Sequence, residues 1–186
     1  FPTKIWEKAG ELGFIGVHYP EEYSGQGLGV LENIIIADAF CAQDSSIGSA
    51  VVLASFASEC LLRFGSEELK QKYLPAVAEG KMLSSGAFTE PGHGSDITSL
   101  DTTAVREGDE WVINGEKAWI TNGGVADYMT VFATVDPASK HAGICAFLVE
   151  KDWQGVSVGR PIPKMGQRCS NTVGLNFKDV RVPSEN

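Results

Sequence analysis

The stretch EWVINGEKAWIT at residues 110–121 carries the clearest strand signal in this sequence. Two alternating runs rich in β-branched and aromatic residues flank Asn114-Gly115, as in half-buried strands. Because Asn-Gly favours a tight type I′ turn, the stretch predicts a hairpin that turns at these two residues. Further strands are predicted from similar runs at 128–135, 143–150 and 172–182.

The sequence before residue 84 has a different period. Apolar residues recur there at spacings of three and four, which predicts helices at 3–13, 31–42 and 46–63. The fold class is therefore α+β, with an all-helical N-terminal domain at residues 1–83 and a β domain at residues 84–186.

Composition narrows the classes of partner. The formal net charge is −9 and the 15 basic residues are scattered, which argues against nucleic acid and against an anionic membrane surface. We expect no membrane-spanning segment, because no apolar run looks long enough to cross a bilayer. The four cysteines lack the spacing of a zinc site, so we expect no metal and reduced thiols, as in bacterial cytoplasm or the mitochondrial matrix. A small-molecule ligand is the expected partner.

Two segments are candidates for binding that ligand. In GAFTEPGHGSD, residues 86–96, a strand-like approach enters a loop whose glycines leave backbone N–H groups accessible to a ligand, although a surface turn also explains this composition. In KAWITNGG, residues 117–124, Trp119 and Thr121 are two apart and are expected on one face of a strand. An indole beside a hydroxyl suits a flavin ring, and a sheet core with an ordinary strand threonine is the alternative.

TEPGHGSD at 89–96, INGEKAWITNGG at 113–124 and KMGQRCSNTVGLNFKDVRVP at 164–183, in this order, closely resemble the acyl-CoA dehydrogenase family. The resemblance runs the length of the chain. It implies a helical N-terminal domain, a β-barrel-like middle domain and a C-terminal helical bundle, with FAD between the last two. The sequence starts without methionine and stops just after a strand-like run, so we expect a longer parent protein that supplies the bundle.

The resemblance also implies residue roles. Thr89 is expected at the pyrimidine edge of FAD and Thr121 near its N5, and the full set of implied FAD contacts is Gly86, Ala87, Phe88, Thr89, Gly94, Ser95, Trp119, Ile120 and Thr121. The implied substrate contacts are Ser95, Gly48, Ser49, Val52 and Phe56.

The implied reaction is 2,3-desaturation of an acyl-CoA thioester with electrons passed to an electron-transfer flavoprotein. The base in relatives is a glutamate of the C-terminal domain, so no catalytic residue is expected here, and Glu90 is expected to be structural. We expect His93 to face solvent. Arg168 is expected to contact a CoA phosphate or a neighbouring subunit, or to be solvated.

The parent is expected to be a homotetramer or homodimer. Three alternatives stay open: an acyl-CoA oxidase or a flavin monooxygenase on the same fold, or a non-catalytic acyl-CoA or flavin-binding module.

Overall fold

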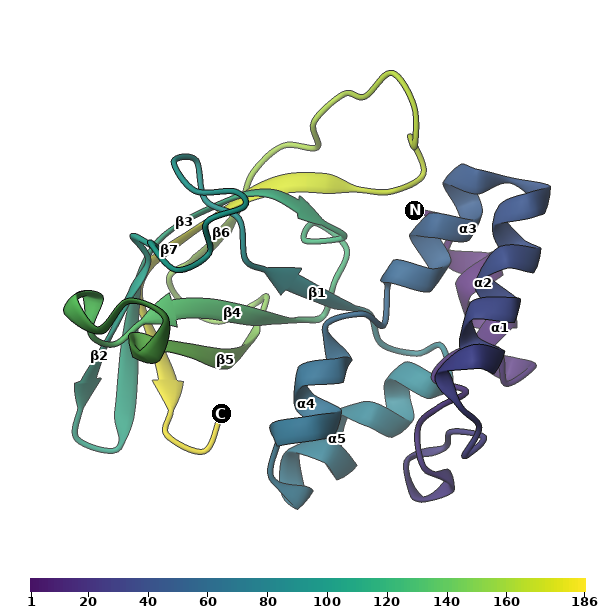
Figure 1. The fold of residues 1–186 in the computed structure, drawn as a ribbon, viewed down its shortest axis with the longest axis horizontal. Helices are drawn as coiled ribbons and strands as arrows, with labels where there is room; N and C mark the ends of the chain where they lie inside the picture. The colour runs from purple at the N-terminus through teal and green to yellow at the C-terminus, as the bar shows by residue number, and fades with distance from the viewer.

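The computed structural model describes residues 1–186, with the helices gathered on one side and the strands on the other (Figure 1). The helices are α1 (Thr3–Glu11), α2 (Val30–Gln43), α3 (Ser45–Leu53), α4 (Ser58–Phe64) and α5 (Glu67–Ala78), with 3-10 turns at Glu21–Tyr23 and Pro137–Gly143. The strands are β1 (Ser84–Ala87), β2 (Thr103–Glu107), β3 (Glu110–Thr121), β4 (Tyr128–Thr134), β5 (Ile144–Glu150), β6 (Val156–Val158) and β7 (Thr172–Pro183). The predicted fold class, helices followed by a β-barrel-like sheet, is confirmed.

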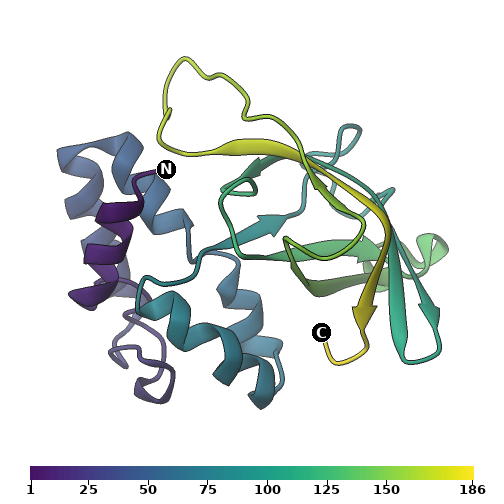
Figure 2. The ribbon, with the colours of Figure 1, turned by 180° about the vertical axis from the view of Figure 1, so that it is seen from behind.

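All seven strands belong to one curled sheet in the order β1-β4-β2-β3-β7-β6, with β5 on β4. The two long strands, β3 and β7, run antiparallel along most of their length, and β1 pairs in parallel with β4. The segment between β6 and β7 leaves the sheet and arches toward α3, as both views show (Figure 2). There the Cys169 N–H donates to Ser46 Oγ at 3.0 Å.

Each half of the chain has its own apolar core. One is built around Trp6, Tyr73 and Leu74 of the helices, and the other around Ile113, Val131 and Val173 of the sheet. Tyr128 of β4 and Leu148 of β5 belong to the helical core, so the sheet contributes directly to the packing of the helices.

The predicted hairpin turn at Asn114-Gly115 is wrong. The chain turns earlier, between Glu107 and Glu110, where Gly108 supplies a φ of +66°. Asn114 and Gly115 lie inside the continuous strand β3 instead. The Asn114 side chain binds Asp179 of β7, where β7 carries one extra residue, and a Cβ on Gly115 would lie 2.5 Å from Thr102 Oγ1. Asn114 and Gly115 therefore serve contacts with residues remote in sequence: Asn114 binds the bulge in β7, and Gly115 leaves room for Thr102.

The helix predicted at 46–63 is broken into α3 and α4. The break occurs because two backbone carbonyls that would continue the helix bind the sheet: Ala54 O accepts from Ser84 N at 2.8 Å, and Ala57 O accepts from Thr130 Oγ1 at 3.1 Å. By length and composition alone, Ser45–Phe64 is long and apolar enough to cross a membrane, which corrects our expectation that no such run exists. In the fold this segment is bent, and Val51, Ala54 and Leu61 belong to the helical core.

Candidate functional site

The loop after β1 and the strand β3 meet at the position of the two candidate segments. The Ala118 N–H donates to Thr89 O at 2.8 Å, and Ser85 Oγ donates to Thr121 O at 2.6 Å. The 86–96 loop and the 117–124 segment are therefore neighbours, as a shared binding site requires.

A bulge in β3 determines how Trp119 is presented. Lys117 pairs with Leu175 and Ile120 with Val173, so β3 carries one extra residue between these pairs. Trp119 takes a φ of +59° there and is 64% exposed, while Ile120 is buried. The bulge thus turns an indole out of the sheet next to the loop, and Thr121 beside it is half-buried.

The tip of the loop is open. Gly94 and Ser95 are exposed, and a Cβ on Gly94 would meet no atom within 4 Å. The backbone N–H groups of these two residues donate no hydrogen bond within the chain. The Asp96 carboxylate accepts hydrogen bonds from Thr98 and Ser99, which lower its pKa and fold the far side of the tip into a turn. Free N–H donors without side-chain obstruction are suited to an anionic or carbonyl-rich ligand.

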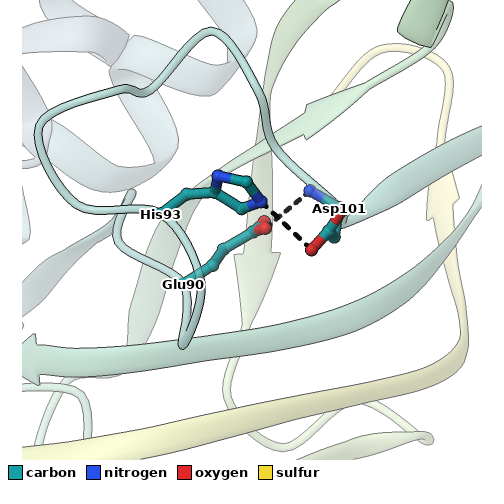
Figure 3. A group of neighbouring side chains, drawn as sticks. All are labelled: Glu90, His93 and Asp101. Atoms are coloured by element: carbon teal, nitrogen blue, oxygen red, sulfur yellow. Dashed lines mark hydrogen bonds and ion pairs between the residues drawn. The ribbon is translucent and has the colours of Figure 1, made fainter.

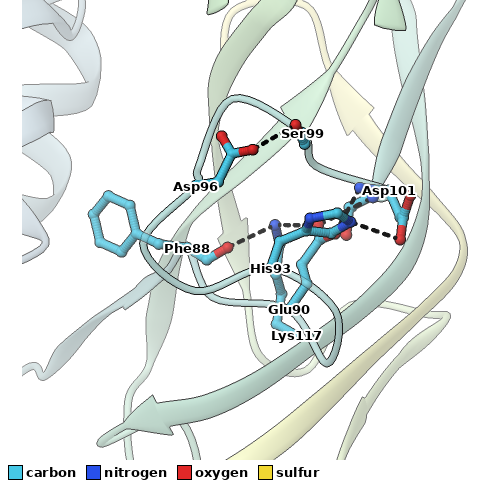
Figure 4. A network of polar contacts seen from close by, with 8 residues as sticks. Phe88, Glu90, His93, Asp96, Ser99, Asp101 and Lys117 are labelled. Atoms are coloured by element: carbon cyan, nitrogen blue, oxygen red, sulfur yellow. Dashed lines mark hydrogen bonds and ion pairs between the residues drawn. The ribbon is translucent and has the colours of Figure 1, made fainter. Parts of the chain in front are cut away.

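A buried ion pair lies beneath this loop (Figure 4). Lys117 Nζ lies 2.7 Å from Glu90 Oε1, and the side chains are 0% and 1% exposed. Lys117 also donates to Phe88 O at 3.2 Å, and Glu90 accepts from the N–H groups of Asp101 and Thr102 at 2.6 and 3.0 Å. Both ends of the loop are thereby attached to β3.

The pair also sets the protonation of its members. Burial acts to raise the pKa of Glu90, but hydrogen bonds from Lys117 and the backbone outweigh it and hold this pKa below its ordinary value. Burial lowers the pKa of Lys117, and Glu90 opposes that change. A carboxylate with these partners is ionised and fully engaged, which agrees with the expected structural role of Glu90.

Sequence reasoning assigned no role to Lys117. Alternation along a strand places residues 117 and 119 on one face, yet the structure buries the lysine and exposes the tryptophan. The bulge breaks the alternation. Its local mark is the positive φ of Trp119, which the sequence does not predict.

His93, predicted to face solvent, is only partly exposed. Its side chain is 26% exposed and folds back so that Nε2 lies 3.2 Å from Asp101 Oδ2 (Figure 3). Ligand atoms of Glu90, His93 and Asp101 lie within 4.8 Å of one another. The Glu90 oxygens are already bound by two N–H groups and an ammonium, so this group fits a hydrogen-bonded network better than a cation site.

The predicted substrate residues differ in exposure. Gly48 is buried against α2, since a Cβ there would lie 2.7 Å from Cys41 N. Ser49 and Val52 are half-buried, and Val52 lines a small cavity between α2 and α3. Phe56 follows α3 and is exposed, and its ring lies 6.4 Å from that of Phe88, beside the loop. Of this set, Ser95 belongs to the 86–96 loop and Phe56 lies next to it through Phe88.

A larger cavity of about 450 Å³ lies between α4 and β5, lined by Cys60, Leu61, Phe132 and Cys145 among others. Phe132 stacks on Phe88 at 4.3 Å between ring centroids, but neither Trp119 nor a residue of the 86–96 loop lines this cavity. Arg168 is exposed, with NH1 donating to Met165 O at 2.9 Å.

Sequence profiles of known families identify this arrangement. The profile of the acyl-CoA dehydrogenase N-terminal domain matches residues 1–81, and that of the acyl-CoA dehydrogenase middle domain matches residues 85–180. The chain belongs to the acyl-CoA dehydrogenase family.

Curated members of the family resemble the chain over its length. A short-chain specific acyl-CoA dehydrogenase of Clostridium acetobutylicum is 41% identical over 100% of the chain and 49% of its own length. A mitochondrial isovaleryl-CoA dehydrogenase of Pongo abelii is 38% identical over 98% of the chain and 44% of its own length. The chain thus spans about half of the relatives it matches.

Solved structures agree. A glutaryl-CoA dehydrogenase from Mycobacterium smegmatis, in complex with FADH2, superposes with a TM-score of 0.90 at 33% identity, covering 100% of the chain and 47% of that protein. The prolyl acyl carrier protein oxidase AnaB superposes with a TM-score of 0.94 at 38% identity, covering 100% of the chain and 50% of that protein.

The residues present fit a flavin of the kind acyl-CoA dehydrogenases carry. The exposed Trp119 offers an apolar face for an aromatic ring, and the free N–H groups of Gly94 and Ser95 suit the anionic part of such a cofactor.

Proposed function

We propose that the parent of this chain is an FAD-dependent acyl-CoA dehydrogenase that desaturates the C2–C3 bond of an acyl-CoA thioester. The observation that carries the proposal is the bond from Ala118 N–H to Thr89 O, because it brings together the two segments for which the family resemblance implies contacts with FAD. In this proposal Thr89, Gly94, Ser95, Trp119 and Thr121 bind FAD, together with Gly86, Ala87, Phe88 and Ile120 of the same segments.

FAD, when bound, supplies the acceptor for the β hydride. The chain's own residues hold the cofactor against β3 and contribute one wall that excludes water, with Ser95 and Phe56 facing the substrate. Removal of the α proton needs a carboxylate near an activated thioester. Glu90 is unsuited to that step since it is buried and bound to Lys117. We place the base in the part of the parent that lies outside residues 1–186.

The test is made on the purified full-length parent. It is expected to be yellow, and its flavin absorbance is expected to bleach on anaerobic addition of butyryl-CoA or isovaleryl-CoA. A panel of acyl-CoA thioesters would then define the substrate. A colourless protein that takes up no FAD contradicts the proposal.

An acyl-thioester oxidase is the second candidate, because AnaB superposes as well as the dehydrogenases do. The two functions differ in the access of oxygen to the reduced flavin. Fast reoxidation in air with production of peroxide favours the oxidase, and slow reoxidation favours the dehydrogenase.

We propose an electron-transfer flavoprotein as the physiological acceptor and a homo-oligomeric parent in bacterial cytoplasm or mitochondrial matrix. Reduction of a purified electron-transfer flavoprotein by the substrate-reduced parent tests the first point, and light scattering of the parent tests the second.

A further inference from the structure

The path of β3 changes at the residue that reaches under the loop. Up to Lys117 the strand is paired with β7, and Lys117 opposes Leu175. The next N–H, that of Ala118, leaves the ladder and binds Thr89 O. Trp119 then takes its positive φ, and pairing resumes at Ile120. The contacts to the loop and the bulge that exposes the indole therefore occur together.

Glu90 closes the loop on itself. Its two oxygens accept from Asp101 N and Thr102 N, which lie eleven and twelve residues further along the chain. Lys117 then joins this closed loop to β3 through Glu90 Oε1 and Phe88 O. The loop backbone contributes no regular secondary structure between residues 88 and 102, so this polar network fixes its position.

We propose that Lys117 and Glu90 act as positioning residues: the buried pair fixes the 89–96 loop on β3 and holds the bulge that presents Trp119 beside it. Neither residue is catalytic. As a statement about flavin binding this rests on the proposed function, whereas the positioning of loop and strand stands without it.

Single and double substitutions distinguish this positioning role from a general contribution of the ion pair to stability. Replacing one member leaves a buried charge without its partner, which destabilises the whole domain. Replacing both by uncharged residues of similar shape removes the attachment without an isolated charge. The double variant Glu90→Gln/Lys117→Met is therefore the informative one, with Glu90→Gln as the single variant.

The experiment uses the full-length parent and measures hydrogen exchange by mass spectrometry in peptides covering residues 117–121, with and without FAD, together with FAD affinity and the melting temperature. Lys8→Met is the matched control, because it removes the exposed pair Lys8–Glu11, whose side chains are 64% and 63% exposed. In the double variant, exchange in this segment is expected to be about tenfold faster or more, and FAD affinity about tenfold weaker. Lys8→Met is expected to match the wild type in exchange at 117–121 and in FAD affinity.

Two results would overturn the inference: wild-type exchange at 117–121 in the double variant, or acceleration spread evenly over the β strands, which is the mark of a general structural role. Fast local exchange in a parent that binds no FAD supports the positioning role while the proposed function fails. The two ideas are thereby tested separately.

Discussion

Three donors meet at the Glu90 carboxylate, so its ionisation is coupled to folding. Lys117 Nζ, Asp101 N and Thr102 N all favour the charged form, and the folded-state pKa is lowered. An acid with a lowered folded pKa stabilises the fold above its unfolded pKa, about 4.3 for glutamate. That contribution is lost as the pH falls through the folded pKa.

Glu90→Gln is expected to reduce the free energy of unfolding by about 3 kcal/mol at neutral pH, because Lys117 remains buried without its charge partner. Below about pH 4 the variant is expected to lose stability less steeply than the wild type, since it has no carboxylate to protonate. Urea unfolding across this pH range measures both effects. If the unfolding free energy of both proteins fell equally steeply with pH in the acid range, the lowered folded-state pKa of Glu90 would be contradicted.

Trp119 lies at the surface, so its contribution to folding and its contribution to binding are separable. With 64% of its area exposed, Trp119→Ala is expected to change the unfolding free energy of the FAD-free protein by about 0.5 kcal/mol or less. Flavin affinity of the parent is expected to fall, because a ring-stacking surface is lost. Met165→Ala, at an exposed apolar residue outside the two segments proposed to bind FAD, is the control. Unchanged flavin affinity in Trp119→Ala would remove this residue from the site.

At the scale of elements, α2 and α3 approach each other closely at Gly48. In an isolated helix, alanine is favoured over glycine by about 0.5–1 kcal/mol. Here the added Cβ would lie 2.7 Å from Cys41 N and 2.8 Å from Cys41 Sγ. This steric clash outweighs the gain in helix propensity, so the substitution lowers the free energy of unfolding. Gly48→Ala is expected to destabilise the protein by about 1–3 kcal/mol.

Chemical unfolding of Gly48→Ala and of the neighbouring Ser49→Ala measures this difference. Ser49 is half-buried, and its substitution is expected to be neutral or slightly stabilising. A Gly48→Ala variant more stable than the wild type would show that the two helices separate without cost.

Helices and strands with a regular hydrophobic period could be predicted from the sequence. Breaks and bulges caused by hydrogen bonds to residues distant in sequence could not. The strand predicted at 128–135 is β4, and the helix predicted at 31–42 is α2. The break at Ala54 and the bulge at Trp119 depend instead on backbone groups captured by Ser84 and Thr89. At the candidate site, the motifs pointed to the loop and the strand that the structure shows as neighbours, whereas the role of Lys117 in joining them could be seen only in the fold.

At the scale of the whole molecule, a buried hydrogen-bonded junction joins the helices to the sheet. The buried Ser58 hydroxyl of α4 is 2.7 Å from Tyr128 OH of β4 and 3.0 Å from Ser84 Oγ of β1. Nearby, Tyr73 OH of α5 donates to the Glu150 carboxylate of β5 at 2.6 Å. With Tyr128 and Leu148 packed in the helical core, we propose that residues 1–83 and 84–186 form two domains that unfold as one unit.

Tyr128→Phe tests that coupling because it removes a single buried hydroxyl and leaves the ring in place. Burial raises the pKa of Tyr128, so the hydroxyl is protonated and available to Ser58. Its loss is expected to cost about 1–2 kcal/mol. The helices, followed by far-ultraviolet circular dichroism, and the sheet, followed by hydrogen exchange of β3 and β7, are expected to shift together to lower denaturant. If the helices lost stability while the sheet kept its wild-type midpoint, the junction would not couple the two domains, because a shared cooperative unit has a single midpoint.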